Sequence, residues 1–311
     1  MIELRSYQID GLAAIWNYFQ SGETGNPVVA WPCGVGKSLI PSVFIRHVMH
    51  TWPNQRFLVM VHVKELIEQN FNLMKEIWPN SPAGIYSAGL KQKDYALPII
   101  FGGIQSMIKD PKKFGHRDII FIDEGHLVNQ DQASMYQKFI AVMKSINPLV
   151  KVIGMTATPY RMGQGYITDG GLFTEIVHDI TGMHPFNKLI EEKYISLLIP
   201  KSTKTELDVS NVAIVKGEYA PGPLQKAVDR EEITFAGLRE LVEVGRNRKS
   251  WLIFASGIEH SDHIASMLEH FNIECASVHS KQTPEYNDNA IKTFKNFELR
   301  AICNYGKLTT G

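Results

Sequence analysis

Three features are scarce in this 311-residue sequence: cysteine, an excess of one charge, and long apolar runs. The three cysteines show no CxxC spacing, which argues against a disulfide framework and against a zinc site. The 32 basic and 32 acidic residues cancel, so any contact with a polyanion must be local. No apolar run approaches the roughly 20 residues that cross a bilayer, and the N-terminus MIELRSYQID is unlike a secretion signal. We therefore expect a cytoplasmic protein with no membrane partner.

The sequence does contain enough apolar material for packed cores, with 44% hydrophobic and 21% charged residues. Short apolar runs alternate with amphipathic stretches, beginning with a helix-like segment at 7–19. The strand-like runs are 26–31, 56–62, 97–103, 118–124 and 150–158. Nearly continuous apolar strands between helices favour an α/β fold, with a parallel sheet covered by helices on both faces.

The alternation weakens between residues 160 and 232, where glycines cluster early and a PGP segment comes late. Such a stretch is typical of a linker with partial structure. The alternation then resumes, and a chain of 311 residues is long enough for a second domain. We predict a first domain over 1–185, a linker over 186–235 and a partial second α/β domain over 236–311.

The strongest motif is GVGKS, directly after the run 26–31 and before a helical run. Glycines let backbone N–H groups point at phosphates, and a helix N-terminus attracts the same anion. Lys37 would reach the β- and γ-phosphates, and the Ser38 hydroxyl would bind Mg²⁺. The strict pattern has glycine where Trp31 stands, so other kinds of turn and other P-loop enzymes remain open at this step. The predicted phosphate-binding residues are Gly34, Val35, Gly36, Lys37 and Ser38.

An acidic motif, Asp123-Glu124-Gly125-His126, ends the apolar run 118–124. Ligands of parallel α/β sheets bind at the carboxyl ends of the strands. Asp123 would hold Mg²⁺, and Glu124 would orient and deprotonate an attacking water. The alternative is an Asp-Glu pair that only begins a solvated loop, and a histidine such as His126 is by itself more often structural than functional.

A third motif, Thr156-Ala157-Thr158-Pro159, closes the run 150–158. Hydroxyls at this edge can bond to the acidic motif and report the nucleotide state to another domain. We assign His126, Thr156 and Thr158 to such coupling. The motif is weak by itself, because Thr-Pro turns are ordinary strand endings.

In order and spacing, GVGKS, DEGH and TATP resemble the superfamily 2 helicases. The resemblance implies RecA-like P-loop domains, with Lys37, Asp123 and Glu124 as catalytic residues. The segment LRSYQ looks like the family's adenine-reading motif, in which Arg5 and Gln8 would contact the base.

Further segments extend the resemblance. VHVKELIEQN is similar to the family's motif Ia, GGIQSM to its motif Ib, and FASGIEHSDHIASML to its motif IV. These motifs touch the backbone of the bound strand in the family. The resemblance therefore assigns nucleic-acid contacts to Lys64, Gln105, Ser106 and Ser256. For Lys64, a solvated lysine at a helix start is an equal alternative.

Within the superfamily, LRSYQ, HVKEL, the DExH box and TATPYRMGQG most resemble the bacterial RadD-type DNA-dependent ATPases. The XPB-like repair helicases and restriction-enzyme motors are more distant. This resemblance implies ATP and Mg²⁺ as cofactors, and ATP hydrolysis coupled to movement on or remodelling of DNA in repair or recombination. It implies single-stranded or branched DNA as partner, with RNA left open, and a single-stranded-DNA-binding protein as a partner of a missing C-terminal region.

The final segment, NYGKLTTG, looks like the opening of motif V, so we expect a chain truncated there, without motif VI. Motif VI supplies arginine fingers in this family, and such a finger contributes about 10³ to 10⁵ in rate. Weak turnover is therefore expected. The alternatives are a module that binds ATP and nucleic acid without efficient hydrolysis, a motor fragment of a restriction or phage-defence system, and an RNA helicase.

Overall fold

The computed structural model describes residues 3–128, 134–161, 165–204, 207–215 and 218–308. The end of the expected motif V, 309–311, and residues 162–164 of TATPYRMGQG lie outside these ranges. The chain forms two compact units, Met1–Leu197 and Leu198–Gly311.

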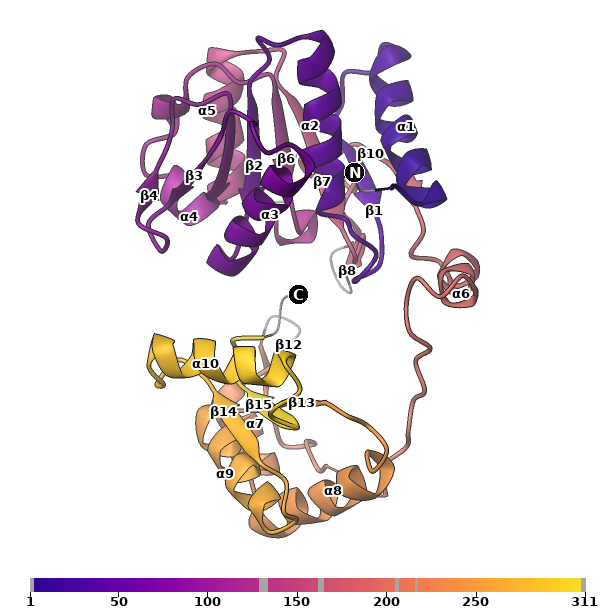
Figure 1. Ribbon diagram of the computed structural model, residues 1–311, viewed down its shortest axis with the longest axis vertical. Coiled ribbons are helices and arrows are strands. Elements are labelled where there is room, and N and C mark those ends of the chain that lie inside the picture. Colours follow the sequence, from indigo (N-terminus) through magenta and orange to yellow (C-terminus); the bar gives the residue numbers. More distant parts are fainter. Residues whose placement is uncertain (1–2, 129–133, 162–164, 205–206, 216–217, 309–311) are drawn as a thin grey trace. The chain divides into compact units, whose positions relative to one another are not determined.

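An eight-stranded sheet organises the first unit (Figure 1). Its strands are β1 (Pro27–Ala30), β2 (Phe57–Val61), β3 (Ala83–Ser87), β4 (Gln92–Lys93), β5 (Ile99–Gly103), β6 (Ile119–Ile122), β7 (Lys151–Thr156) and β10 (Glu175–Asp179). They lie in the order β10-β1-β7-β6-β2-β5-β3-β4. All neighbours are parallel except β3 and β4. A short hairpin, β8 (Tyr160–Arg161) and β9 (Gly165–Tyr166), stands apart from this sheet.

Helices cover both faces of the sheet, as the sequence predicted. They are α1 (Ser6–Gln20), α2 (Leu39–Thr51), α3 (Lys64–Ile77), α4 (Ile104–Met107), α5 (Met135–Ile146) and α6 (Met183–Glu191), with 3-10 turns η1 (Pro111–Phe114) and η2 (Gly125–Leu127). Strand side chains alternate between the faces. Val29 packs in one cluster with Phe44 of α2, and Val28 packs in another with Phe139 of α5. Because both faces are buried, the strands appear as unbroken apolar runs.

The weakly patterned stretch 160–232, of which residues up to 185 were predicted to belong to the first domain, contains elements that the sequence pattern did not show. Within it, β10 is an edge strand of the main sheet, parallel to β1. Leu189 of α6 lies in the same apolar cluster as α1 and α2. The sequence concealed this strand because its side chains are only partly buried and its ends, Glu175 and Asp179, are exposed and charged.

The second unit contains a parallel sheet of β13 (Trp251–Phe254), β15 (Ala301–Asn304) and β14 (Cys275–Val278), in that order. The helices α8 (Glu231–Val244) and α9 (Ile258–Glu269) contribute to a cluster on one face, and α10 (Pro284–Lys295) packs on the other. The remaining elements are α7 (Pro221–Val228) and the hairpin β11 (Ile214–Val215) and β12 (Glu218–Tyr219). Thus α7 and the start of α8 occupy part of the range 186–235 that the sequence indicated as linker.

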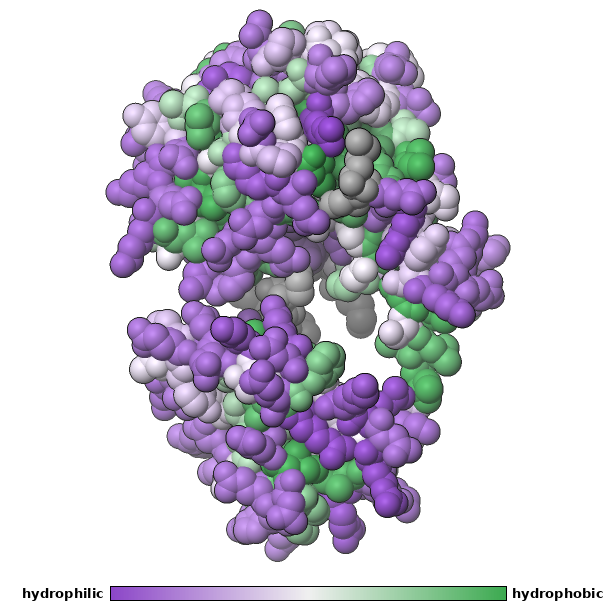
Figure 2. Space-filling view, viewed as in Figure 1, coloured by the Kyte–Doolittle hydropathy of each residue, from purple (hydrophilic) through white to green (hydrophobic). Residues whose placement is uncertain are grey.

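The face of the first unit that Figure 2 shows is mainly hydrophilic. No helix in the described part of the chain combines the length and apolar character needed to span a membrane.

Candidate nucleotide-binding site

Three predicted motifs meet at the carboxyl edge of the first unit's sheet. The GVGKS loop follows β1, the DEGH motif follows β6, and the TATP motif begins at the end of β7. The strands β1, β7 and β6 are parallel neighbours. Their carboxyl ends therefore open onto one site, which is where parallel α/β sheets bind ligands.

The GVGKS loop has the backbone that its glycines were expected to supply. Gly34 and Gly36 adopt positive φ angles of 80° and 82°, which strain any other residue. The Lys37 Nζ donates to the carbonyl oxygens of Trp31 and Pro32 at 3.2 and 3.3 Å. Ser38 directly precedes the first residue of α2, so the loop leads into a helix N-terminus. A cationic head group thus sits within a loop whose geometry suits a phosphate.

Trp31, the departure from the strict P-loop pattern, turns its side chain away from this loop. The indole is fully buried, and its Nε1 donates to Nδ1 of His178 at 2.7 Å. The indole also lies over Gly11 of α1, with the Tyr7 ring edge-on at 5.4 Å. The loop uses only the backbone of Trp31, whose N–H bonds to Thr156 and whose carbonyl accepts from Lys37. A large residue is therefore compatible with the loop at this position.

The predicted base-reading residues lie at the start of α1, where Gln8 contacts the loop and Arg5 is linked to it through Tyr7 and Gln8. The Tyr7 hydroxyl and the Gln8 Nε2 both donate to the Val35 carbonyl, at 2.9 and 3.1 Å. Gln8 Oε1 also accepts from the Arg5 N–H at 2.9 Å, and Gln8 is only 3% exposed. The structure therefore brings Arg5 and Gln8 to the loop, and the Gln8 amide links the helix start to it.

Of the acidic pair, Asp123 is buried and Glu124 is partly buried. Asp123 is 7% exposed, and its Oδ1 accepts from the Glu124 N–H at 3.0 Å. Burial first, and then the neighbouring Glu124 charge, raise the pKa of Asp123 above its ordinary value, while Lys37 and a hydrogen bond from Asn70 act in the opposite direction. Glu124 has a left-handed backbone, with φ 51° and ψ 51°, which is uncommon for a residue other than glycine.

His126 and Thr156, two of the predicted coupling residues, are in direct contact. His126 Nδ1 lies 2.9 Å from the Thr156 hydroxyl and 3.3 Å from Glu124 Oε2. The same hydroxyl accepts from the Thr158 N–H at 3.0 Å. Thr158 therefore joins through its backbone, and its side chain is exposed. A continuous polar chain runs from the acidic motif to the end of β7.

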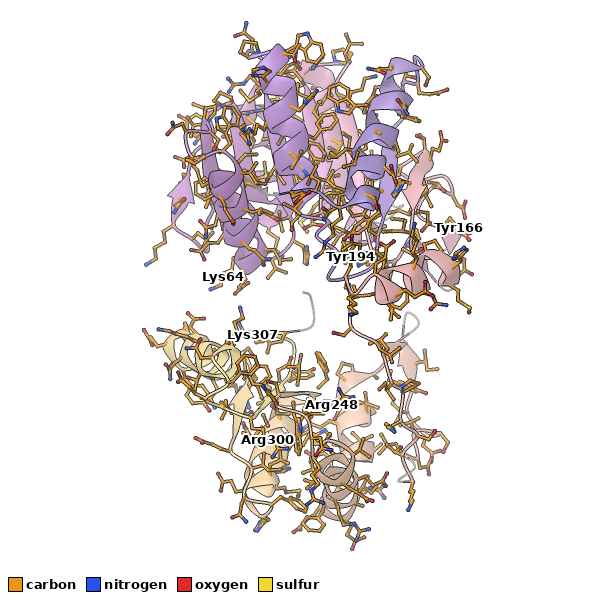
Figure 3. All side chains as sticks on the ribbon, turned by 45° about the vertical axis from the view of Figure 1, so that its right-hand side comes forward. Lys64, Tyr166, Tyr194, Arg248, Arg300 and Lys307 are labelled. Carbon is orange, nitrogen blue, oxygen red and sulfur yellow. The ribbon has the colours of Figure 1, made fainter. Side chains whose placement is uncertain are left out.

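The predicted nucleic-acid residues of the first unit follow its strands at the same edge. Lys64 begins α3 directly after β2, is 48% exposed in its side chain, and lies 3.5 Å from Glu65 (Figure 3). Gln105 and Ser106 belong to α4, which follows β5; Gln105 is exposed, and the Ser106 hydroxyl accepts from the Ala88 N–H at 3.1 Å. An exposed ion pair such as Lys64 with Glu65 contributes little stability, so the lysine remains available to a ligand.

Ser256 lies in the second unit, just after β13. Its hydroxyl is 2.8 Å from Nδ1 of His260 in α9. Burial lowers the pKa of His260, which favours its neutral form. The contact fixes the orientation of the serine within its own unit.

Sequence reasoning missed two residues of the site. Asn70 had a signal, because it interrupts the buried stripe of Ile67 and Met74 on α3 with an amide. Tyr194 had none, because it lies in the weakly patterned stretch after α6. Its ring lies beside Arg5, with the Arg5 Cζ 4.3 Å from the ring centroid.

Comparison with known proteins gives a family and two named relatives. A family model described as "Type III restriction enzyme, res subunit" matches residues 1–161. "Putative ATP-dependent helicase IRC3" of Saccharomyces cerevisiae is 25% identical over 99% of this chain and 45% of its own length. "Putative mitochondrial ATP-dependent helicase irc3" of Schizosaccharomyces pombe is 26% identical over 100% of this chain and 50% of its own length. The chain thus spans about half the length of these relatives.

Among solved structures, Saccharomyces cerevisiae Dbp5 bound to RNA and ADP BeF3 is similar, with a TM-score of 0.56 and 13% identity. The match covers 99% of this chain and 75% of that one. At this identity the likeness concerns the fold alone, and it confirms the predicted RecA-like architecture.

Proposed function

Since the chain belongs to the family of the type III restriction enzyme res subunit, we propose that it is the ATP-hydrolysing motor of a superfamily 2 nucleic-acid helicase. One observation carries the proposal. The GVGKS loop, the buried acidic pair and the linked pair His126 and Thr156 lie at one edge of a parallel sheet, at the ends of neighbouring strands. Helix N-terminus, cation, carboxylates and a polar connection are the parts that phosphoryl transfer uses.

The residues present fit ATP and Mg²⁺. Lys37 would release the carbonyls of Trp31 and Pro32 and bind phosphate oxygens, because an ionised acceptor makes the stronger bond. Asp123 and Glu124 place two carboxylates together under low exposure, an arrangement that a divalent cation relieves. Ser38 and Asp123 would hold Mg²⁺, which supplies positive charge to the phosphate oxygens when bound.

Glu124 would act as the general base. Its carboxylate accepts the proton of the attacking water, and the neighbouring His126 nitrogen, 3.3 Å from Oε2, holds it in place. His126 also bonds to Thr156, so a change in the position of the carboxylate reaches the end of β7. This connection supports a coupling role for His126, Thr156 and Thr158.

We propose DNA, single-stranded or branched, as the polymer on which the motor acts. Lys64, Gln105 and Ser106 follow strands of the first unit, and Ser256 follows a strand of the second. Lysine, amide and hydroxyl groups suit phosphate contacts without sequence readout, and of these residues Lys64 and Gln105 are exposed while the two serines are partly buried. The names of the yeast relatives as ATP-dependent helicases support a nucleic-acid substrate.

The finer proposal is a DNA repair or recombination motor of the RadD type, with a single-stranded-DNA-binding protein as a partner. It is supported by the resemblance of LRSYQ and the motifs that follow it. The family description instead names a restriction enzyme. One fold and one kind of site can serve both roles, so the process and the nucleic acid on which the motor acts must be measured. Stronger stimulation of ATP hydrolysis by forked DNA than by intact duplex would favour the repair motor.

The test of the motor is steady-state ATP hydrolysis with and without single-stranded DNA or RNA, beside a nucleotide-binding titration. Lys37→Ala is expected to abolish ATP binding. Glu124→Gln should bind ATP normally and lose about 10²-fold or more in rate, the range of general-base catalysis. An unchanged rate in Glu124→Gln would remove the catalytic role of this residue.

The same experiment distinguishes the helicase motor from the second candidate function, a module that binds ATP and nucleic acid without efficient hydrolysis. ATP binding without turnover in the wild-type chain, on every polymer tried, would support a binding module without hydrolysis. Base recognition has its own variant: Gln8→Ala should weaken the preference for ATP over GTP. An unchanged preference would remove Gln8 from the base site.

A further inference from the structure

The Arg5 guanidinium is held both in its plane and on one face. In the plane, Nη1 donates to the Tyr7 hydroxyl at 3.0 Å. That hydroxyl in turn donates to the Val35 carbonyl in the GVGKS loop. On the face, the Tyr194 ring centroid lies 4.3 Å from Cζ. The position of this cation is therefore fixed relative to the phosphate loop.

Tyr194 is itself anchored within the first unit. Its backbone N–H donates to the Leu189 carbonyl at the end of α6, at 2.9 Å. Its ring, which is labelled in Figure 3, meets the Tyr7 ring edge-on, with centroids 5.6 Å apart. Among the described residues, none accepts from or donates to its hydroxyl. The ring, rather than the hydroxyl, is thus the part that the structure uses.

A guanidinium has two faces, and stacking on one of them leaves the other available. Arg5 is only half-buried, and in the described part of the chain Nε and Nη2 have no acceptor. A planar cation of this kind stacks on aromatic rings and donates to ring nitrogens. A purine base offers a large flat face and acceptor nitrogens. Because Tyr194 already restricts the arginine, less rotamer freedom is lost when the base binds.

We propose that Tyr194 is a positioning residue for base recognition: its ring holds the Arg5 guanidinium flat, so that the opposite face receives the purine of the nucleotide. This inference rests on the proposed function, in which ATP binds at the GVGKS loop. It adds selectivity for purines over pyrimidines, whose smaller rings cover less of the cation.

The experiment compares the affinity of the full chain for ATP, CTP and inorganic tripolyphosphate in Mg²⁺. Tyr194→Leu keeps an apolar side chain in the cluster but removes the aromatic face. We expect it to weaken ATP binding about three- to tenfold, the range of a partly desolvated cation–π contact. Affinity for tripolyphosphate, which has no base, should stay within about twofold by the same reasoning. The ratio of ATP to CTP affinity should fall.

Three further variants isolate the route through Arg5. Tyr194→Phe should behave as wild type, since it retains the ring. In the double variant with Arg5→Ala, Tyr194→Leu should add nothing to the loss caused by Arg5→Ala alone. Tyr95→Leu is the matched control, because the Lys113 Nζ also lies 4.3 Å from that ring centroid and the pair is not part of the site.

The outcomes separate this inference from the proposed function. A wild-type chain that binds neither ATP nor tripolyphosphate would overturn both. Normal ATP binding by wild type and by Tyr194→Leu, with the same ATP to CTP ratio, would overturn only the role of Tyr194. A loss of equal size for all three ligands would also overturn it, because a purely structural defect has that effect.

Discussion

Replacing Gly11 by alanine tests whether Trp31 joins α1 to the phosphate loop. A Cβ at Gly11 would lie 2.3 Å from Trp31 Cζ2, where ordinary contacts are 3.4–4 Å. Helix and indole would have to separate by about 1 Å. The indole cannot move freely, because it is fully buried and donates to His178 at 2.7 Å.

The expected magnitude combines two opposed effects. Overpacking a close-packed core costs about 1–3 kcal/mol, and alanine is better than glycine in a helix by about 1 kcal/mol. We place the packing cost at the upper end, since a displaced indole also strains its hydrogen bond, which contributes about 1 kcal/mol. The free energy of unfolding should fall by about 2 kcal/mol in urea denaturation. Tripolyphosphate affinity should fall as well, because Trp31 lies at the start of the loop that carries Lys37, and a displaced Trp31 shifts that loop.

Two variants control this experiment. Gly237 lies in α8, and nothing lies within 4 Å of a Cβ added there, so Gly237→Ala should stabilise by about 0.5–1 kcal/mol. Gly11→Ala combined with Trp31→Phe should be destabilised by less than the sum of the single changes, since the shorter ring makes room for the new methyl group. A Gly11→Ala protein as stable as wild type would refute the packing argument.

Three other predictions follow from the site. Thr156→Val should lower the free energy of unfolding by about 1–3 kcal/mol, because it removes the hydroxyl that contacts His126 and leaves the Thr158 N–H without that acceptor, whereas Thr156→Ser should not. The raised pKa of Asp123 means that the folded chain binds its proton more tightly, so this group's stabilising contribution is lost as pH rises through the folded pKa. Asp123→Asn should therefore be more stable than wild type at pH 7 in EDTA, with the difference closing toward about pH 4, and equal midpoints across that range would contradict this. Lys64→Ala should weaken DNA binding and reduce the log–log salt slope by about 1, measured by fluorescence anisotropy.

Much of the first unit was predictable because its strands are buried on both faces. The runs around β1, β2, β5, β6 and β7 stand out as apolar segments. A helix is the next element after β1, β2 and β5, and this alternation predicted the parallel sheet. The motifs were predictable for a related reason, since each directly follows such a strand. Once the sheet is parallel, the ends of β1, β6 and β7 face the same side.

The parts that could not be predicted depend on tertiary contacts between weakly patterned segments. The strand β10 is a partly exposed edge, so its sequence lacks an apolar run. Trp31 departs from the motif, and only the space above Gly11 explains where its indole goes. Tyr194 contacts Arg5, although the two residues lie near opposite ends of the first unit's sequence. No local periodicity encodes such a meeting.

The left-handed backbone of Glu124 sets stability and activity against each other at one position. A residue other than glycine with φ near 51° costs about 1 kcal/mol or more, which glycine would not incur. In the proposed role of Glu124 as general base, its carboxylate is the gain that offsets this cost. In a lineage that retains ATP binding but abandons turnover, drift should replace the glutamate with glycine or asparagine. The residue at this position in a related chain would then indicate whether that chain still hydrolyses ATP.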